Sequence, residues 1–258
     1  MVALVRRQDH EARREVNPWP YPARVAHRGA GKLAPENTLA ALRRGAEFDY
    51  RMFEFDVKLS ADNALVLMHD PLLNRTTNAS GRLAAATLAD LARIDAGSWH
   101  SAQYAGESVP TLERVAAWLR ANDYLANIEI KPCPGREAQT GAAVAIEVRH
   151  LWRDAPALPL LSSFSVTALE KVRAHAPELP RALLFHVLPE DWLEQCLALG
   201  CVAVDTHYAT LSPEIIARAH EAGLRVVAYT VNDPERAEQL FGWGLDMLIT
   251  DAIDHIQP

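Results

Sequence analysis

The sequence lacks three features, and each absence argues against a class of protein. No run of eighteen apolar residues occurs among its 258 residues, so no transmembrane helix is expected. Basic residues are not in excess, because the net charge is −7, which argues against binding to nucleic acid or to anionic membranes through a basic surface. No Gly-x-Gly-x-x-Gly segment follows the first strand-like run, which disfavours a dinucleotide-binding sheet.

Cysteine is also scarce. Cys133, Cys196 and Cys201 form neither a Cys-x-x-Cys pair nor an even-numbered framework, so a reduced, cytosolic compartment is the simpler interpretation. Arg6 and Arg7 lie where a secretory signal would need an apolar core. The sequence therefore predicts a cytoplasmic protein, and we interpret residues 1–18 as an N-terminal tail.

Strand-like and helix-like patterns alternate along most of the chain, which is typical of an α/β protein. Eight apolar runs have strand character, and they centre on Val25, Phe53, Ile128, Leu161, Leu183, Val202, Val226 and Leu248. Eight such units in about 235 residues predict a (β/α)₈ TIM barrel that occupies residues 19–258 as one domain. An open, doubly wound sheet is the alternative.

Residues 71–110 interrupt this alternation. Only Thr87 to Ile94 has a helical pattern there, and the segment is longer than an ordinary βα connection. We therefore expect a small insertion after the second barrel strand. Beyond it the pattern is regular again, and one of the predicted strands runs from Cys201 to Asp205.

Two carboxylates stand in the apolar strand pattern Met52 to Val57. Glu54 and Asp56 are two residues apart, so their side chains project from the same face, roughly 6–7 Å apart along the backbone. Like charges on one buried face are costly unless a cation or hydrogen bonds compensate them. Glu129 lies in a second run of this kind. Three carboxylates at barrel strand ends predict a site for Mg²⁺ or Ca²⁺ rather than zinc.

Histidines and cations are expected around these carboxylates. A hairpin turn near Asp62 would return the chain so that His69 lies within a residue or two of the carboxylate pair, and His27 ends the first strand. The two imidazoles could act as general base and general acid. Arg28 and Lys131 would add positive charge for a phosphate group. A metal, cations and paired imidazoles together describe phosphodiester cleavage.

Several short motifs resemble those of glycerophosphodiester phosphodiesterases, in their compact bacterial cytosolic form. In chain order they are His27-Arg28-Gly29, Pro35-Glu36-Asn37-Thr38, Glu54-Phe55-Asp56, His69-Asp70, Arg75-Thr76-Thr77, Glu129-Ile130-Lys131, Ser162-Ser163-Phe164 and Thr230-Val231-Asn232. The resemblance runs from about Trp19 to the C-terminus. It implies a TIM barrel with a small insertion after its second strand, and hydrolysis of glycerophosphodiesters to sn-glycerol 3-phosphate and an alcohol with a divalent cation.

The resemblance also implies roles for individual residues. Phe164 and Tyr229 are similar to the apolar shelf for the glycerol, although many relatives carry tryptophan where Tyr229 stands. The remaining roles follow the motifs: Glu54, Asp56 and Glu129 as metal ligands, His27 and His69 as the acid–base pair, and Arg28 and Lys131 as phosphate-binding cations. The expected partner is a small glycerophosphodiester, such as glycerophosphocholine or glycerophosphoethanolamine. Nucleic acid and membrane insertion are not expected, and the protein is expected to be a monomer or homodimer.

Other interpretations stay open from sequence alone. The carboxylates could pair only with Arg28 and Lys131, although three acids against two cations leave one charge unmatched. His207 also ends a predicted strand and is a further site candidate, whereas Glu36 could orient Arg28 or Asn37, or touch the substrate. A related barrel could instead cleave lysophospholipids as a lysophospholipase D or act as a phosphoinositide-type lipase, and a non-catalytic sugar-phosphate-binding barrel is the alternative outside enzymes.

Overall fold

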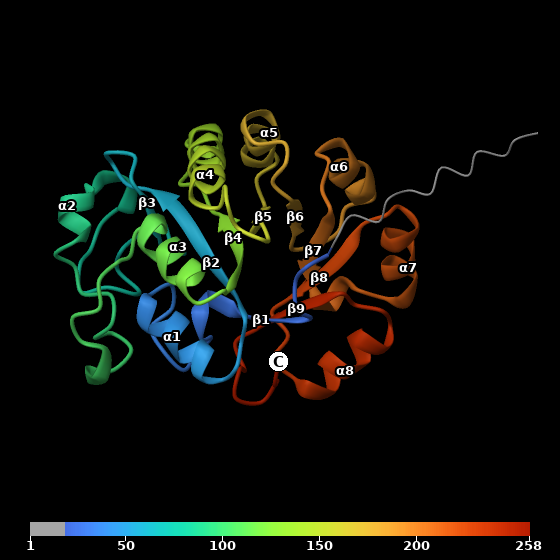
Figure 1. The fold of residues 1–258 in the computed structure, drawn as a ribbon, viewed down its shortest axis with the longest axis horizontal. Helices are drawn as coiled ribbons and strands as arrows, with labels where there is room; N and C mark the ends of the chain where they lie inside the picture. Colours follow the sequence, from blue (N-terminus) through green and yellow to red (C-terminus); the bar gives the residue numbers. More distant parts are fainter. Residues whose placement is uncertain (1–18) are drawn as a thin grey trace, which may run out of the picture.

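Eight parallel strands close into a barrel in the computed structural model, which describes residues 19–258 (Figure 1). The strands are β1 Arg24–Ala26, β2 Met52–Leu59, β4 Leu125–Ile130, β5 Leu160–Ser163, β6 Arg181–Phe185, β7 Ala203–His207, β8 Arg225–Tyr229 and β9 Met247–Thr250. Pairing between β1 and β2 closes the sheet, which confirms the predicted (β/α)₈ barrel and excludes the open-sheet alternative. The predicted tail, residues 1–18, lies outside the described residues.

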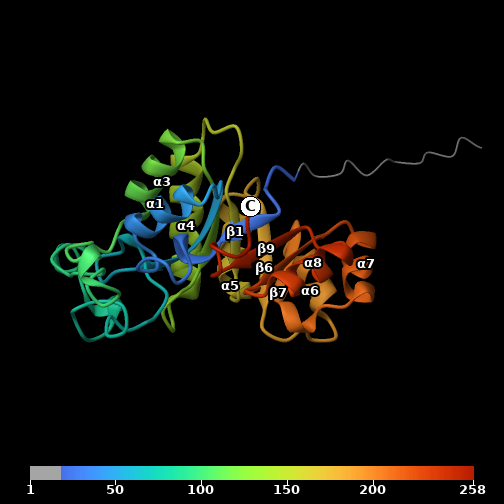
Figure 2. The same ribbon diagram turned by 90° about the horizontal axis from the view of Figure 1, so that it is seen from below.

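Helices surround the barrel on the outside (Figures 1 and 2). They are α1 Leu39–Glu47, α3 Leu112–Ala121, α4 Glu137–Leu151, α5 Val166–His175, α6 Trp192–Ala198, α7 Pro213–Glu221 and α8 Pro234–Gly242. Thr38, Thr111, Ser165 and Ser212 cap α1, α3, α5 and α7 by accepting a hydrogen bond from a backbone N–H of the first turn. In the described part of the chain, no helix is both long and apolar enough to cross a membrane.

One predicted strand begins too early. The strand expected from Cys201 is observed as β7, which begins at Ala203. The Cys201 N–H donates instead to the carbonyl of Cys196 and so terminates α6, with Gly200 in the left-handed region at φ +64°. The predicted strand was too long because the apolar sequence pattern does not distinguish the end of helix α6 from the start of β7.

The second strand is longer than its neighbours and extends beyond the barrel. Its end, Val57 to Leu59, pairs in antiparallel fashion with β3 (Leu65–Leu67). The Met68 N–H then donates to the Asp56 carbonyl at 3.1 Å. This hairpin brings His69 back beside the carboxylate strand, as the sequence predicts.

Residues 71–110 lie beside β2 and β3, on the side of the barrel away from β7 (Figures 1 and 2). They contain only short elements, namely η2 Leu83–Ala85, α2 Leu88–Leu91 and η3 Ala102–Tyr104. Buried apolar side chains from this segment pack against β3 and its surroundings in a small separate core that includes Val66, Met68, Leu83 and Leu91. The segment is therefore anchored to the same hairpin that carries His69.

Asp95 organises part of this segment and gives its stability a pH dependence. Its carboxylate accepts hydrogen bonds from the backbone N–H groups of Gly97, Ser98 and Gly106 at 2.8–2.9 Å. Those bonds, led by the one from Ser98, lower the pKa of Asp95 to about 2. A pKa below the unfolded value, about 3.9, stabilises the fold above that value, and this contribution disappears as the pH falls through about 2.

Replacing Asp95 with asparagine is expected to lower the free energy of unfolding, and the difference from wild type should be largest near neutral pH. It should shrink as the pH falls from about 4 to about 2, because the wild-type carboxylate becomes protonated over that interval. Urea unfolding of both proteins at several pH values measures this difference. A gap that stays constant across the interval would contradict the role of the Asp95 charge.

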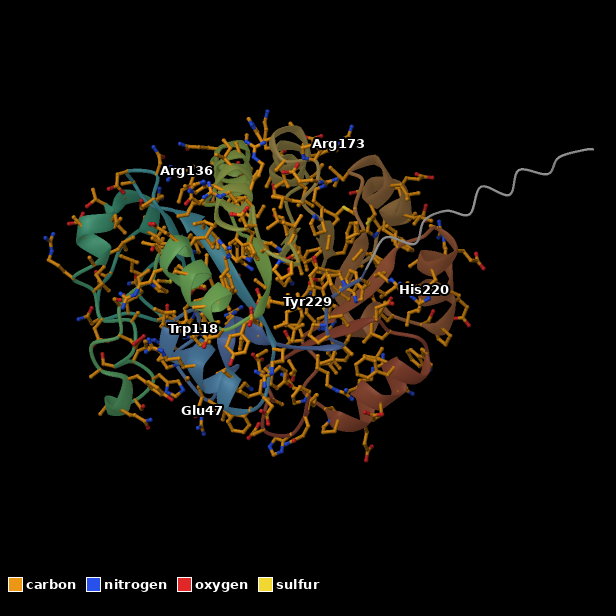
Figure 3. The ribbon with its side chains drawn as sticks, in the orientation of Figure 1. Glu47, Trp118, Arg136, Arg173, His220 and Tyr229 are labelled. Atoms are coloured by element: carbon orange, nitrogen blue, oxygen red, sulfur yellow. The ribbon has the colours of Figure 1, made fainter. Side chains whose placement is uncertain are left out.

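The barrel interior changes character along its axis. At the N-terminal ends of the strands, its side chains are apolar and include Val25, Met52, Leu160 and Ala203. Figure 3 shows Tyr229 near the centre of the barrel, whereas Glu47, Arg173 and His220 lie at the periphery. Most ionisable residues predicted as functional lie at or just after the C-terminal ends of barrel strands, where TIM-barrel enzymes carry their active sites. Glu54 lies within β2, level with the end of β1, and His69 follows the hairpin strand β3.

Candidate active site

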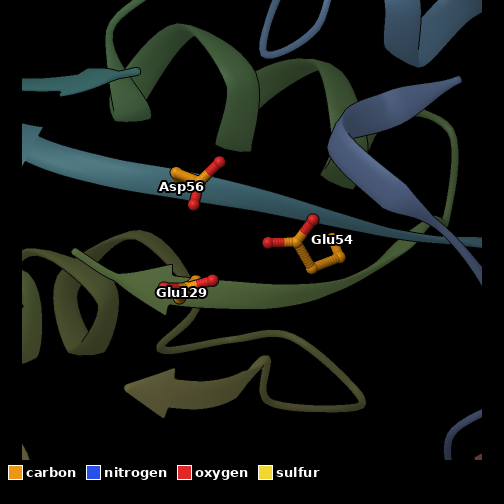
Figure 4. A group of neighbouring side chains, drawn as sticks. All are labelled: Glu54, Asp56 and Glu129. Atoms are coloured by element: carbon orange, nitrogen blue, oxygen red, sulfur yellow. The ribbon is translucent and has the colours of Figure 1, made fainter. Parts of the chain in front are cut away.

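Three buried carboxylates form a cup at the C-terminal mouth of the barrel. Glu54 and Asp56 come from β2, and Glu129 comes from the neighbouring β4 (Figure 4). The strand register sets Asp56 directly opposite Glu129. One oxygen of each carboxylate lies within 4.8 Å of one oxygen of the other two. We call Glu54, Asp56 and Glu129 the carboxylate cup.

The electrostatics of the carboxylate cup fit a divalent cation. Burial and the neighbouring carboxylates raise the pKa of Glu54 well above its usual value, and burial followed by the Asp56 charge raises the pKa of Glu129 to about 7. Among the described residues, the Glu54 Oε1 atom is buried and has no hydrogen-bond partner. An unpartnered carboxylate oxygen beside two others is the donor set that Mg²⁺ or Ca²⁺ prefers. The cluster can therefore hold a metal ion.

Asp56 differs from its two neighbours because polar groups surround it. Burial alone would raise its pKa, but the charges of Lys131 and Arg28 outweigh burial and hold the pKa well below its usual value. The Asn37 side chain donates to Asp56 Oδ2 at 2.8 Å and accepts from the Asp56 N–H at 2.9 Å. Sequence reasoning gave Asn37 no role at the site, because nothing local shows that it reaches β2.

His27 follows β1 and lies between Asp251 and the carboxylate cup. Its Nδ1 donates to Asp251 Oδ1 at 2.6 Å, and its Nε2 lies 3.8 Å from Glu54 Oε2. A proton fixed on Nδ1 leaves Nε2 as the atom that can exchange a proton at the site. Asp251 is itself held by Asn232, whose Oδ1 accepts from the Asp251 N–H at 2.8 Å. Asn232 belongs to one of the motifs that resemble those of the phosphodiesterases, but sequence reasoning assigned no function to Asn232 or to Asp251.

Arg28 adopts a left-handed backbone conformation at φ +50° in the turn that follows β1. Its backbone N–H donates to Glu54 Oε2 at 3.0 Å. The guanidinium Nη1 donates to Glu36 at 2.9 Å, and Nε lies 3.5 Å from Asp56 Oδ2. Gly31, at φ +56°, allows the following turn, since a Cβ there would lie 2.1 Å from the Asp251 carbonyl oxygen.

Lys131 follows β4 and connects the carboxylate cup to an aromatic surface. Its Nζ donates to Glu129 Oε1 at 2.7 Å and lies 3.4 Å from Asp56 Oδ1. The same ammonium lies 5.5 Å from the centre of the Phe164 ring. Phe164 is 45% exposed and meets the Tyr229 ring edge-to-face at 5.9 Å. These two rings form the aromatic surface. The Tyr229 hydroxyl donates to the Phe185 carbonyl, so its ring, and not its hydroxyl, is left to face a ligand.

The other two histidine candidates differ in their surroundings. His69 Nδ1 donates to Asp70 Oδ1 at 2.7 Å, and burial lowers the pKa of this imidazole. His207 has its ring 6.1 Å from the Tyr229 ring, and its Nδ1 accepts from the Ala209 N–H at 3.3 Å. His69 follows Met68, whose N–H donates to the Asp56 carbonyl, so it lies beside the carboxylate cup, whereas His207 borders the aromatic surface.

Comparisons with known proteins agree on one family. The family model of the glycerophosphoryl diester phosphodiesterase family matches residues 27–255. A glycerophosphodiester phosphodiesterase of Caldanaerobacter subterraneus subsp. tengcongensis is 34% identical over 232 residues, which cover 88% of this chain and 93% of that protein.

Two solved structures are similar over nearly the whole chain. A phosphodiesterase of Oleispira antarctica in complex with the product sn-glycerol-3-phosphate matches with a TM-score of 0.86 and 35% identity, covering 92% of this chain and 95% of the other. A glycerophosphodiester phosphodiesterase of Agrobacterium tumefaciens matches with a TM-score of 0.77 and 29% identity, covering 91% and 98%.

Proposed function

The chain belongs to the glycerophosphoryl diester phosphodiesterase family, and on that premise we propose that it hydrolyses small glycerophosphodiesters with the help of a divalent cation. The products are sn-glycerol 3-phosphate and a free alcohol. One observation supports this chemistry above the others. His27 and His69 lie beside the carboxylate cup at the C-terminal mouth of the barrel, and the Nδ1 atom of each donates to its own carboxylate.

The residues divide the work in the proposed reaction. Glu54, Asp56 and Glu129 would hold the cation, which would supply positive charge to neutralise the phosphate oxygens. Arg28 and Lys131 hold the remaining phosphate charge, and the Phe164 and Tyr229 rings support the carbon chain of the glycerol. One histidine accepts the proton of the nucleophile at Nε2 while the other donates a proton to the leaving alcohol.

The proposal extends to the substrate and its setting. Glycerophosphocholine and glycerophosphoethanolamine are the proposed substrates, and the cytoplasm is the proposed compartment. The proposed working unit is a monomer or homodimer whose single catalytic domain spans residues 19–258, with residues 71–110 as an insertion. The net charge of −7 argues against docking on anionic membranes and so favours a small, water-soluble substrate.

Product analysis tests the proposed function directly. The full chain with Mg²⁺ or Ca²⁺ is incubated with glycerophosphocholine and, separately, with lysophosphatidylcholine. We expect sn-glycerol 3-phosphate and choline from the first substrate, and much slower turnover of the second. Faster cleavage of lysophosphatidylcholine would favour a lysophospholipase D. Binding of glycerophosphocholine without any product would favour a non-catalytic barrel, and either result would overturn the proposal.

A further inference from the structure

Arg75 lies at the start of the 71–110 segment and holds two carboxylates at once. Its Nε and Nη2 donate to Asp70 Oδ2 and Oδ1 at 2.7 and 3.0 Å. Its Nη1 and Nη2 donate to Glu36 Oε2 and Oε1 at 2.7 and 2.8 Å. Two bidentate pairs on one guanidinium are a demanding geometry, yet the Arg75 side chain is 45% exposed. A surface arginine held this firmly is not explained by local packing.

Each of those carboxylates orients a different residue of the active site. Asp70 Oδ1 accepts from His69 Nδ1 at 2.7 Å, and Glu36 Oε1 accepts from Arg28 Nη1 at 2.9 Å. A continuous chain of hydrogen bonds therefore runs from His69 through Asp70, Arg75 and Glu36 to Arg28. Arg75 stands at its centre, because it is the group that joins the two halves.

We propose that Arg75 is a positioning residue that sets the orientation of the His69 imidazole and the Arg28 guanidinium together. This inference rests on the proposed function, in which His69 transfers a proton and Arg28 binds phosphate. It assigns a role to Arg75, the first residue of the Arg75-Thr76-Thr77 motif, which the proposed reaction itself does not use.

Charge and geometry both explain why an arginine is needed. Asp70 and Glu36 are two like charges that converge on one point, and only a cation between them makes that arrangement favourable. The bonds from Arg75 lower the pKa of Asp70, so Asp70 stays an acceptor and keeps the proton of His69 on Nδ1. A lysine offers one point charge and cannot reproduce two planar bidentate contacts.

The test compares Arg75→Ala and Arg75→Lys with wild type in steady-state hydrolysis of glycerophosphocholine. Loss of a partner that orients catalytic groups is expected to lower kcat about 10–100-fold. KM should rise as well, because Arg28 is released. Guanidinium chloride at millimolar concentration should restore part of the Arg75→Ala activity, whereas Arg75→Lys should stay impaired without it.

A matched control lies in the same segment. Arg93 is exposed and pairs with the neighbouring Asp90 at 2.8 Å, so Arg93→Ala should leave kcat, KM and the response to guanidinium unchanged. Activity of Arg75→Ala within twofold of wild type would overturn the assignment. So would a loss that guanidinium does not relieve and that matches a lower melting temperature. An inactive wild type would instead refute the proposed function, so the two failures are distinguishable.

Discussion

Replacing His69 with alanine is expected to lower kcat for glycerophosphocholine by about 10²–10⁴-fold, the usual contribution of a positioned acid or base. The reason is structural: Asp70 binds Nδ1 of this imidazole, so Nε2 is the atom left for proton transfer. The affinity for the cation should stay near the wild-type value, because the carboxylate cup that would hold it does not include His69. Steady-state kinetics and a cation titration measure the two quantities.

A control and a second substrate make this result specific. His150 lies in α4 on the outside of the barrel and is exposed, so His150→Ala should behave as wild type. A glycerophosphodiester with a p-nitrophenol leaving group needs little help from an acid. If His69 is the acid, His69→Ala recovers on that substrate while His27→Ala does not, and the reverse pattern makes His27 the acid. Loss of less than tenfold in both variants would refute acid–base catalysis by the pair.

Disrupting the carboxylate cup is expected to be as damaging. Asp56→Asn should weaken binding of Mg²⁺ or Ca²⁺ and lower kcat by about a hundredfold or more, since a catalytic cation stabilises the transition state by several kcal/mol. Asparagine preserves the shape that Asn37 contacts but removes the charge. EDTA should abolish wild-type activity, and the added cation should restore it. Activity that survives EDTA would contradict a metal-dependent reaction.

The pH dependence of cation binding provides an independent measurement. Because burial and the Asp56 charge raise the pKa of cation-free Glu129 to about 7, protons compete with the cation at and below that pH. Affinity should therefore weaken as the pH falls through about 7, with proton release on binding. Calorimetry in buffers of different ionisation enthalpy measures the released protons. Glu129→Gln should release fewer protons, whereas Glu113→Gln, on helix α3, should match wild type.

The carboxylate pair, the hairpin before His69 and the barrel could be predicted because each has a signature in the local sequence pattern. Glu54 and Asp56 are recognisable because two charges in an apolar strand are unusual wherever they occur, and the turn before His69 lies only a few residues away. The barrel itself follows from the repeated spacing of strand and helix patterns. These features depend on contacts between neighbours in sequence.

Partners that meet only through barrel closure could not be predicted in the same way. Asp251 reaches His27 because β9 pairs with β1, although the two residues are 224 positions apart. Arg75 reaches Glu36 across 39 positions and through an irregular segment. An aspartate after a strand and an arginine in a loop are common, so neither residue type identifies its partner. For Asp251, the expected adjacency of the last and first barrel strands was the available signal.

The join between β1 and β2 has a consequence for how the enzyme opens. These strands share one residue pair, Ala26 with Phe53, whereas β2 and β4 pair over six positions from Met52 to Val57. Local opening of the barrel should therefore start at this join, where few backbone bonds must break. His27 and Arg28 follow β1 and Glu54 lies in β2, so a ligand that contacts all three residues would hold the two strands together. Amide hydrogen exchange in β1 should then slow on ligand binding, making the substrate part of what keeps the barrel closed.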